Sequence, residues 1–340
     1  MWEWLTRSWR GPGNKAPTPL FEHGKLTSGK HPDELPAIDR DDLAKLDRFL
    51  FAWFLDCDDR LLKSPRHSDR PLRRELQRAL ASPEAALQSL PRQTMVLPQL
   101  MKAVADPTIN RHALAEIILA DPALTDQLLH MANSPYFRPG ELTIESVDHA
   151  VFVLGIEGVR SLIAAAVMRP MMRARSQAEA LFAKRAWHWG LACGRAAELI
   201  ARSQNRDGTE FFMVGLLPAL ADLVLFRTIL GLHGKRGESR PAPDLTYQLI
   251  SEHYWRVCAL IAEEWDLPPH YHAHLLEAQR PSIVTAHTPL NDGMILATRE
   301  VLRLAHQRNL PEERLTALLR LSPERFPPIR AQLLEMLRSR

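Results

Sequence analysis

Apolar side chains recur at helical spacing along most of the chain. Between residues 112 and 169 they predict four short helices, separated by prolines, polar residues and a glycine. In the second of these helices Leu124, Leu128 and Met131 stand at positions i, i+4 and i+7, which places them on one helix face. Alternation of the kind that marks a strand never persists, so the pattern predicts an all-α fold.

The same spacing predicts further helices on both sides of this stretch, over residues 41–57, 177–202, 211–230, 245–265, 290–302, 311–321 and 327–338. The helix over residues 177–202 has small residues at its centre, such as Gly190 and Gly194, which let a second helix backbone come close. The helix over residues 211–230 is apolar nearly all round, which is typical of a buried helix. We expect these two helices to form the centre of the core.

Short polar motifs mark where the first two of the four short helices begin and end. Asp121 followed by Pro122 indicates an N-cap carboxylate and a proline at the first helical position. Asn133-Ser134-Pro135 ends the second helix, because the residue before a proline is pushed out of the α region. These residues therefore have local tasks as caps and turn residues.

The third and fourth short helices meet at a glycine. Ser146 has the position of an N-cap, and the apolar repeat that follows it runs to Leu154. Gly155 then stands where a helix ends on a residue with positive φ. A new apolar stripe begins at Val159, so we predict a break between the two helices.

The order of these motifs resembles the core of the HDOD domain, the HD-related output domain of bacterial signalling proteins. The residues that match its motifs are Asp121, Pro122, Asn133, Ser134, Pro135, Leu154 and Gly155. The resemblance implies an HD-like multi-helix bundle with an N-terminal helical lobe, and a regulatory role in signal transduction. Because each matching residue also has a local structural task, we do not interpret them as a binding site.

The resemblance covers the middle of the chain and leaves helical extensions at both ends. We divide the chain into a Trp-rich arm and Pro-rich linker (1–40), an N-terminal helical extension (41–89), the HDOD-like domain (90–285) and a C-terminal helical extension (286–340). In the arm, Trp2, Leu5 and Trp9 share a helix face, which would suit a membrane surface. Ten residues are marginal as an isolated helix, so we favour docking on the chain itself or on a second copy.

The resemblance also implies where a metal site would lie. Catalytic HD phosphohydrolases, which HDOD domains resemble, hold divalent ions with a histidine on one helix and a His-Asp pair on the next. The matching positions here are Trp189, Pro218 and Ala219, whose side chains cannot bind a metal. His188 is offset from the first position by about 100° around the helix, and Asp222 has no histidine beside it. We expect no catalytic residue, no metal and no cofactor, and a kink at Pro218.

These absences favour a non-catalytic scaffold that passes a regulatory input to protein partners. Two other functions remain open. A relic phosphohydrolase could use a rearranged metal site at His253, His270 and His274, although surface histidines after a helix start are the simpler explanation. A cyclic-nucleotide or nucleic-acid binder could use three arginines between residues 169 and 175, although such arginines also fit a solvent-exposed segment that connects two helices. The arginines are Arg169, Arg173 and Arg175.

Composition narrows the class of protein further. The net charge is only +3, so we do not expect a nucleic-acid partner. Cys57, Cys193 and Cys258 are lone cysteines, typical of buried thiols in a reducing compartment. The sequence contains no secretory signal and no run of about 18 apolar residues. We therefore expect a cytoplasmic protein whose partners are signalling proteins that the sequence does not name, or a second copy of the chain.

Overall fold

The computed structural model describes residues 40–63, 69–81, 86, 106, 108–134, 136–137, 143–237, 241–279, 287–319 and 321–338. The chain divides into two units, residues 1–36 and 37–340, and all the described residues belong to the second. Within these residues there are twelve α-helices, one 3-10 helix and no strand. The prediction of an all-α fold is confirmed.

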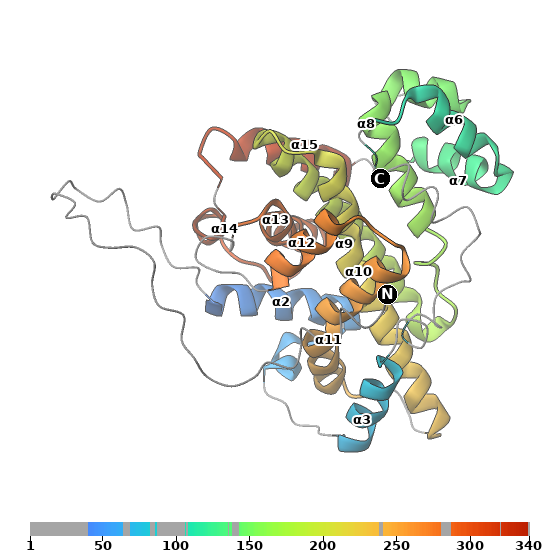
Figure 1. Ribbon diagram of the computed structural model, residues 1–340. Helices are drawn as coiled ribbons and strands as arrows, with labels where there is room; N and C mark the ends of the chain where they lie inside the picture. Colours follow the sequence, from blue (N-terminus) through green and yellow to red (C-terminus); the bar gives the residue numbers. More distant parts are fainter. Residues whose placement is uncertain are drawn as a thin grey trace, which may run out of the picture. The chain divides into compact units, whose positions relative to one another are not determined.

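The helices follow the predicted order, with ends that differ by a few residues (Figure 1). The first group is α2 (Arg40–Leu55), the 3-10 helix η1 (Asp59–Leu62), α3 (Arg70–Ala79), α6 (Arg111–Leu119), α7 (Pro122–Ala132) and α8 (Val147–Met168). The second group is α9 (Gln177–Ser203), α10 (Gly208–Lys235), α11 (Pro243–Glu264), α12 (Pro269–Gln279), α13 (Pro289–Leu304), α14 (Glu312–Leu318) and α15 (Phe326–Arg338).

Helices α9 and α10 form the centre of the bundle, as the small and apolar residues predict. Helix α9 packs against α10 and α13, and α10 also packs against α11. A Cβ atom added to Gly215 of α10 would lie 2.7 Å from the Cα atom of Gly194 on α9. The two backbones therefore touch at this point, and only glycine at both positions allows that distance.

The predicted terminal extensions are part of this bundle. Helix α2 contacts α9 and α13, α3 contacts α10, and α15 contacts α9. The division of the chain into four segments stays a prediction, because residues 1–39 and 87–105 lie outside the described residues. This also holds for the Trp-rich arm.

The third and fourth predicted short helices lie on either side of a kink within the range of α8. The kink lies at Gly155, which has φ 69° and ψ 173°. The positive φ and the predicted break are both confirmed, because the backbone dihedrals of Gly155 are not helical and the two helices meet there at a kink. Helix α8 packs against α6 and α7 and also against α10, so the bend joins the N-terminal helices to the centre.

Helix α10 runs as one element from Gly208 to Lys235 and contains Pro218. The lost backbone hydrogen bond at Pro218 does not interrupt the helix. Both α8 and α10 are long and apolar enough to cross a membrane. The apolar windows are 61% and 89% buried by the rest of the fold, which is typical of core helices. None of the three cysteines forms a disulfide.

We expect Gly215→Ala to lower the free energy of unfolding by about 1–3 kcal/mol, because the added methyl group would push two helix backbones apart. Gly231→Ala on the same helix is the matched control. No atom lies within 4 Å of its added Cβ, so helix propensity favours alanine there by up to about 1 kcal/mol. Urea denaturation of the two variants measures both effects. Equal shifts for both variants would contradict the close contact of α9 and α10.

Candidate functional site

The position that matches the first metal ligand of HD phosphohydrolases is occupied by a buried indole. Trp189 lies on α9 and is 3% exposed. Its Nε1–H group donates a hydrogen bond of 2.9 Å to the Thr298 hydroxyl on α13. Its ring meets the Phe54 ring of α2 edge-on, with the ring centroids 5.6 Å apart. Trp189 thus joins three helices.

His188, the neighbouring residue, faces a different part of the fold. Its Nδ1 atom forms a hydrogen bond with the Tyr136 hydroxyl, and the two rings lie 5.8 Å apart. Tyr136 belongs to the segment after α7, whereas Trp189 contacts α2 and α13. The angular offset predicted from the sequence therefore separates the environments of these two residues.

The positions that match the His-Asp pair are also filled by packing. Pro218 and Ala219 are buried on α10. A Cβ atom added to Gly190 of α9 would lie 2.6 Å from the Ala219 methyl group, so that methyl group fits against the glycine. Among the described residues no group of three or more His, Cys, Asp or Glu side chains could hold a metal ion. The described side chains do not fit the metal centre that HD phosphohydrolases use.

A cavity of about 400 Å³ lies beside Trp189 and is bounded by helices α2, α9, α10, α11 and α13. Its apolar wall is made by α2, with Leu43, Leu46, Leu50 and Phe51. Asp47, Asp222, Ser251 and Tyr254 add polar groups to the lining. The position of Trp189 is therefore next to a cavity that α2 helps to enclose.

Two carboxyl groups in this cavity lie in a desolvated environment. The Tyr247 hydroxyl donates a hydrogen bond of 2.7 Å to Asp47. Burial raises the pKa of the Asp47 carboxyl to about 6. Asp222 is 2% exposed and accepts no hydrogen bond from any described residue. Burial, followed by the charge of Asp47, raises the pKa of the Asp222 carboxyl well above its usual range.

Sequence reasoning did not assign these carboxyl groups to a site, although the pattern held a signal for each. Asp47 stands one helical turn after Leu43 and three residues before Leu50, inside the apolar stripe of α2. Asp222 is an acidic residue within the apolar helix α10. Asp47 and Asp222 line one cavity because α2 packs against the bundle. The apolar stripe of α2 does not by itself reveal which helices it packs against.

The three histidines of the alternative metal site are not brought together in the described contacts. His270 and His274 on α12 share the Glu210 carboxylate of α10, with Nε2–O distances of 3.2 and 3.3 Å. Their charges lower the pKa of Glu210, after the hydrogen bond from His274. His253 lies on α11, where burial lowers its pKa and its charged neighbours are Glu252, Arg256 and Arg73. Two of the three predicted ligands share a carboxylate, and the third has other neighbours.

Of the three arginines of the anion-site hypothesis, Arg169 has a side-chain contact with a ring, and the other two have bonds through their backbone atoms. The Arg169 guanidinium stacks over the Trp187 ring at 5.2 Å, and burial lowers the pKa of Arg169. The backbone carbonyl of Arg173 accepts a hydrogen bond from Arg227. The backbone N–H of Arg175 donates to Glu179 at 2.7 Å. The segment between α8 and α9 is thus held by its backbone, while the Arg173 and Arg175 side chains are exposed.

The family-motif residues act locally, as the sequence predicts. Asp121 caps α7 by accepting from the N–H groups of residues 123 and 124, and Pro122 is the first helical residue. Asn133 does more than end α7, because its side chain both donates to and accepts from the Ile144 backbone across the loop.

Two further motif residues also have local contacts. Ser134 contacts the Met131 sulfur at 3.8 Å. Leu154 is half-buried next to the Gly155 kink and packs against the core. Pro135 lies outside the described residues.

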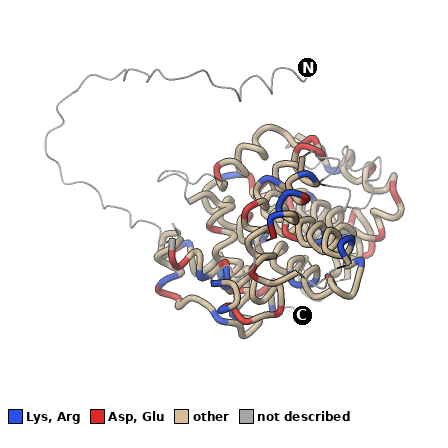
Figure 2. Tube along the Cα trace, turned by 90° about the horizontal axis from the view of Figure 1, so that it is seen from below, with Lys and Arg blue, Asp and Glu red and all other residues tan. Residues whose placement is uncertain are grey.

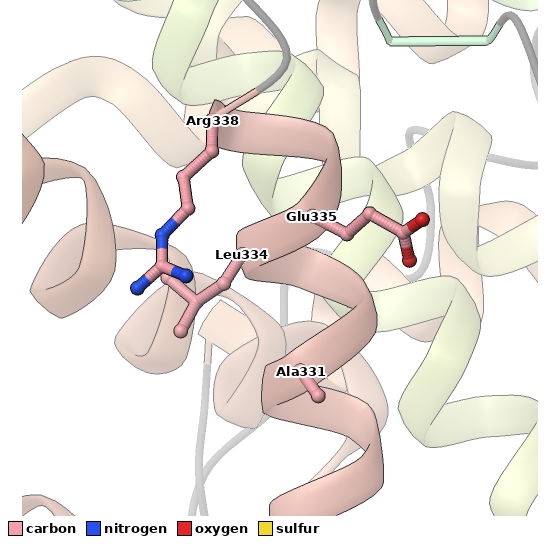
Figure 3. A pocket seen from close by; sticks show the side chains of 4 residues that line it. All are labelled: Ala331, Leu334, Glu335 and Arg338. Atoms are coloured by element: carbon pink, nitrogen blue, oxygen red, sulfur yellow. The ribbon is translucent and has the colours of Figure 1, made fainter. Parts of the chain in front are cut away.

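A second hollow lies along the C-terminal helix α15. It is lined by Ala331, Leu334, Glu335 and Arg338 (Figure 3). The charged ends of Glu335 and Arg338 point to opposite sides of the helix and do not converge on one point. The cavity beside Trp189 is therefore the better candidate for a site.

Asp47 gives stability a defined pH dependence. Its pKa is about 6 in the fold and about 4 in the unfolded chain. Between these values the folded state holds more protons, so the free energy of unfolding falls as pH rises from about 4 to about 6. We expect Asp47→Asn to abolish this pH-dependent fall in the free energy of unfolding, which is on the order of 2 kcal/mol. Thermal unfolding from pH 4 to pH 8 measures this, with the exposed Asp126→Asn as control; parallel curves for wild type and Asp47→Asn would contradict it.

Solved structures of related architecture share this arrangement of helices. A "putative phosphohydrolase" from Shewanella amazonensis superimposes with a TM-score of 0.53 at 17% identity, covering 78% of this chain and 97% of the other. An HDOD domain protein of unknown function from Geobacter sulfurreducens gives 0.50 at 16% identity, covering 77% and 99%. A "putative signal transduction protein" from Marinobacter aquaeolei gives 0.50 at 18% identity, covering 89% and 65%. These likenesses show an HD-like, HDOD-type fold.

Sequence comparison gives the family directly. No curated protein matches the chain in sequence. The family model of the HDOD domain matches residues 90–281. Because this match covers more than half of the 340 residues, the protein belongs to the HDOD domain family.

Proposed function

We propose that this protein is a non-catalytic regulatory scaffold of bacterial signal transduction, which acts in the cytoplasm through contacts with protein partners. One observation carries the proposal: the three positions where HD phosphohydrolases hold their metal ions have become packing positions. Trp189 bonds to Thr298 on α13, and the Ala219 methyl group fits against Gly190. The side chains at these positions cannot bind a metal ion that would activate water, so they do not support a role in hydrolysis.

The comparisons support a signalling role. The family match is to the HDOD domain, and one protein of similar fold is described as a signal transduction protein. The same family fold also occurs in a protein described as a phosphohydrolase. The residues at the metal positions of this chain favour the first of these two roles.

A nucleic-acid or cyclic-nucleotide partner has less support. Figure 2 shows Lys and Arg interspersed with Asp and Glu along the described helices, without one dominant basic stretch. Non-specific binding to nucleic acid depends on such a basic surface. A signalling protein, or a second copy of the chain, is therefore the partner that we propose.

We expect the purified full chain to contain no stoichiometric Mn, Fe or Zn and not to hydrolyse bis(p-nitrophenyl) phosphate when Mn²⁺ is added. Elemental analysis and a colorimetric assay measure the two properties. His270→Ala removes one histidine from the cluster that His270 and His274 form with Glu210. His272→Ala, on the same helix, is the control. Stoichiometric metal that is lost in His270→Ala but kept in His272→Ala would overturn the non-catalytic proposal.

A scaffold is defined by what it binds, so we expect reciprocal capture of a defined partner. The tagged full chain, expressed in its native bacterium, should retain one or more proteins after a wash at high salt. Each of these, tagged in turn, should capture the untagged chain, and size-exclusion chromatography with light scattering should report whether a second copy takes part. A chain that stays monomeric and captures no protein reciprocally would contradict the proposal.

A further inference from the structure

Two acidic side chains from different helices line the cavity beside Trp189. Asp47 comes from α2 and Asp222 from α10, and residues 47 and 222 are far apart in the sequence. The charge of Asp47 acts on Asp222, so the two carboxyl groups share one electrostatic environment. Both acidic groups line the same cavity, so a positive group bound there would favour the ionised form of each.

The fold supplies little to balance a negative charge on these carboxyl groups. Tyr247 holds Asp47 through one hydrogen bond. Among the described residues Asp222 has no hydrogen-bond donor, and neither carboxyl forms an ion pair with a basic side chain. Arg48 lowers the pKa of Asp47 through its charge but is not part of the cavity lining. Asp222 is buried, whereas Asp47 is half-buried. Buried carboxyl groups are normally paired, so a positively charged ligand would give Asp222 the partner that the described residues do not provide.

The rest of the lining fits an organic cation better than a metal ion. Aromatic faces attract cations, and the cavity has three aromatic residues in Phe51, Trp189 and Tyr254. Trp189 contributes to the lining although its N–H group bonds to Thr298 and its ring also packs against Phe54. A metal ion needs several oxygen or nitrogen ligands at close range, whereas this lining is largely apolar. The volume of about 400 Å³ falls within the range of small-molecule sites, roughly 300–1,000 Å³.

We propose that this cavity binds a small organic cation, a protonated amine or quaternary ammonium with an apolar body. The positive group lies between Asp47 and Asp222, and the apolar body packs against the aromatic residues and the leucines of α2.

Because α2 forms one wall, a bound cation links α2 to α9, α10 and α11. Helix α2 lies outside the family match at residues 90–281, so the site combines the family domain with a segment that the family model does not include. The ligand would bias the position of α2 only by binding one arrangement more tightly than another. Its role as a signalling input rests on the proposed scaffold function, whereas binding itself does not.

Isothermal titration calorimetry on the full chain tests the proposal with probes that differ in charge. The cations are benzyltrimethylammonium and 2-phenylethylamine, and the matched neutral and anionic probes are 2-phenylethanol and 3-phenylpropionate. We expect at least one cation to bind with a dissociation constant below about 1 mM and at least ten times more tightly than the neutral and anionic probes. Binding of no cation, or equal binding of amine and alcohol, would overturn the proposal.

Variants then locate the site. We expect Asp222→Asn and Asp47→Asn each to weaken cation binding at least tenfold, and the exposed Asp126→Asn on α7 to leave it unchanged. Circular dichroism establishes that each variant is folded, and the comparison of probes on the unaltered chain stands even if one variant does not fold. Full binding by both cavity variants would place the cation elsewhere and refute the assignment.

The measurement uses the purified chain without a partner. Failure to bind a cation therefore leaves the scaffold proposal intact, and failure to capture a partner leaves the ligand site intact.

Discussion

The contact of two helix backbones at the centre of the bundle is the constraint on which the rest depends. Helices α9 and α10 touch where Gly194 meets Gly215, and again where Gly190 receives the Ala219 methyl group. Such contacts gain dispersion energy along the whole length of both helices. They leave no room at the interface for the larger side chains that a metal site needs.

This constraint accounts for the packing residues at the positions that match the metal ligands of HD phosphohydrolases. Ala219 is small because Gly190 lies against it, and Trp189 fills the space between α9, α13 and α2. The side chains that would hold metal ions have become the side chains that hold helices together. The same packing stabilises the bundle and occupies these positions.

Helix α2 adds a feature that the tight centre does not provide. It covers the bundle beside Trp189 without filling the space completely, so a cavity remains between α2, α10, α11 and α13. Asp47 and Asp222 face that cavity with raised pKa values, because burial disfavours their charged forms. Unpaired carboxyl groups cost stability, and a site for an opposite charge is a physical reason for a fold to contain them.

The sequence by itself determined the helices, the central position of α9 and α10, the local caps and the absent metal ligands. Each of these depends on residues close together in the chain, such as Asp121 with the next turn or Pro218 with Ala219. Only the tertiary structure decided that Asn133 bonds to the Ile144 backbone across a loop, that α2 packs against α9 and α13, and that Asp47 and Asp222 line one cavity. The reason is physical: periodicity fixes which face of a helix is apolar, whereas the partner of that face is set by packing over long sequence separations.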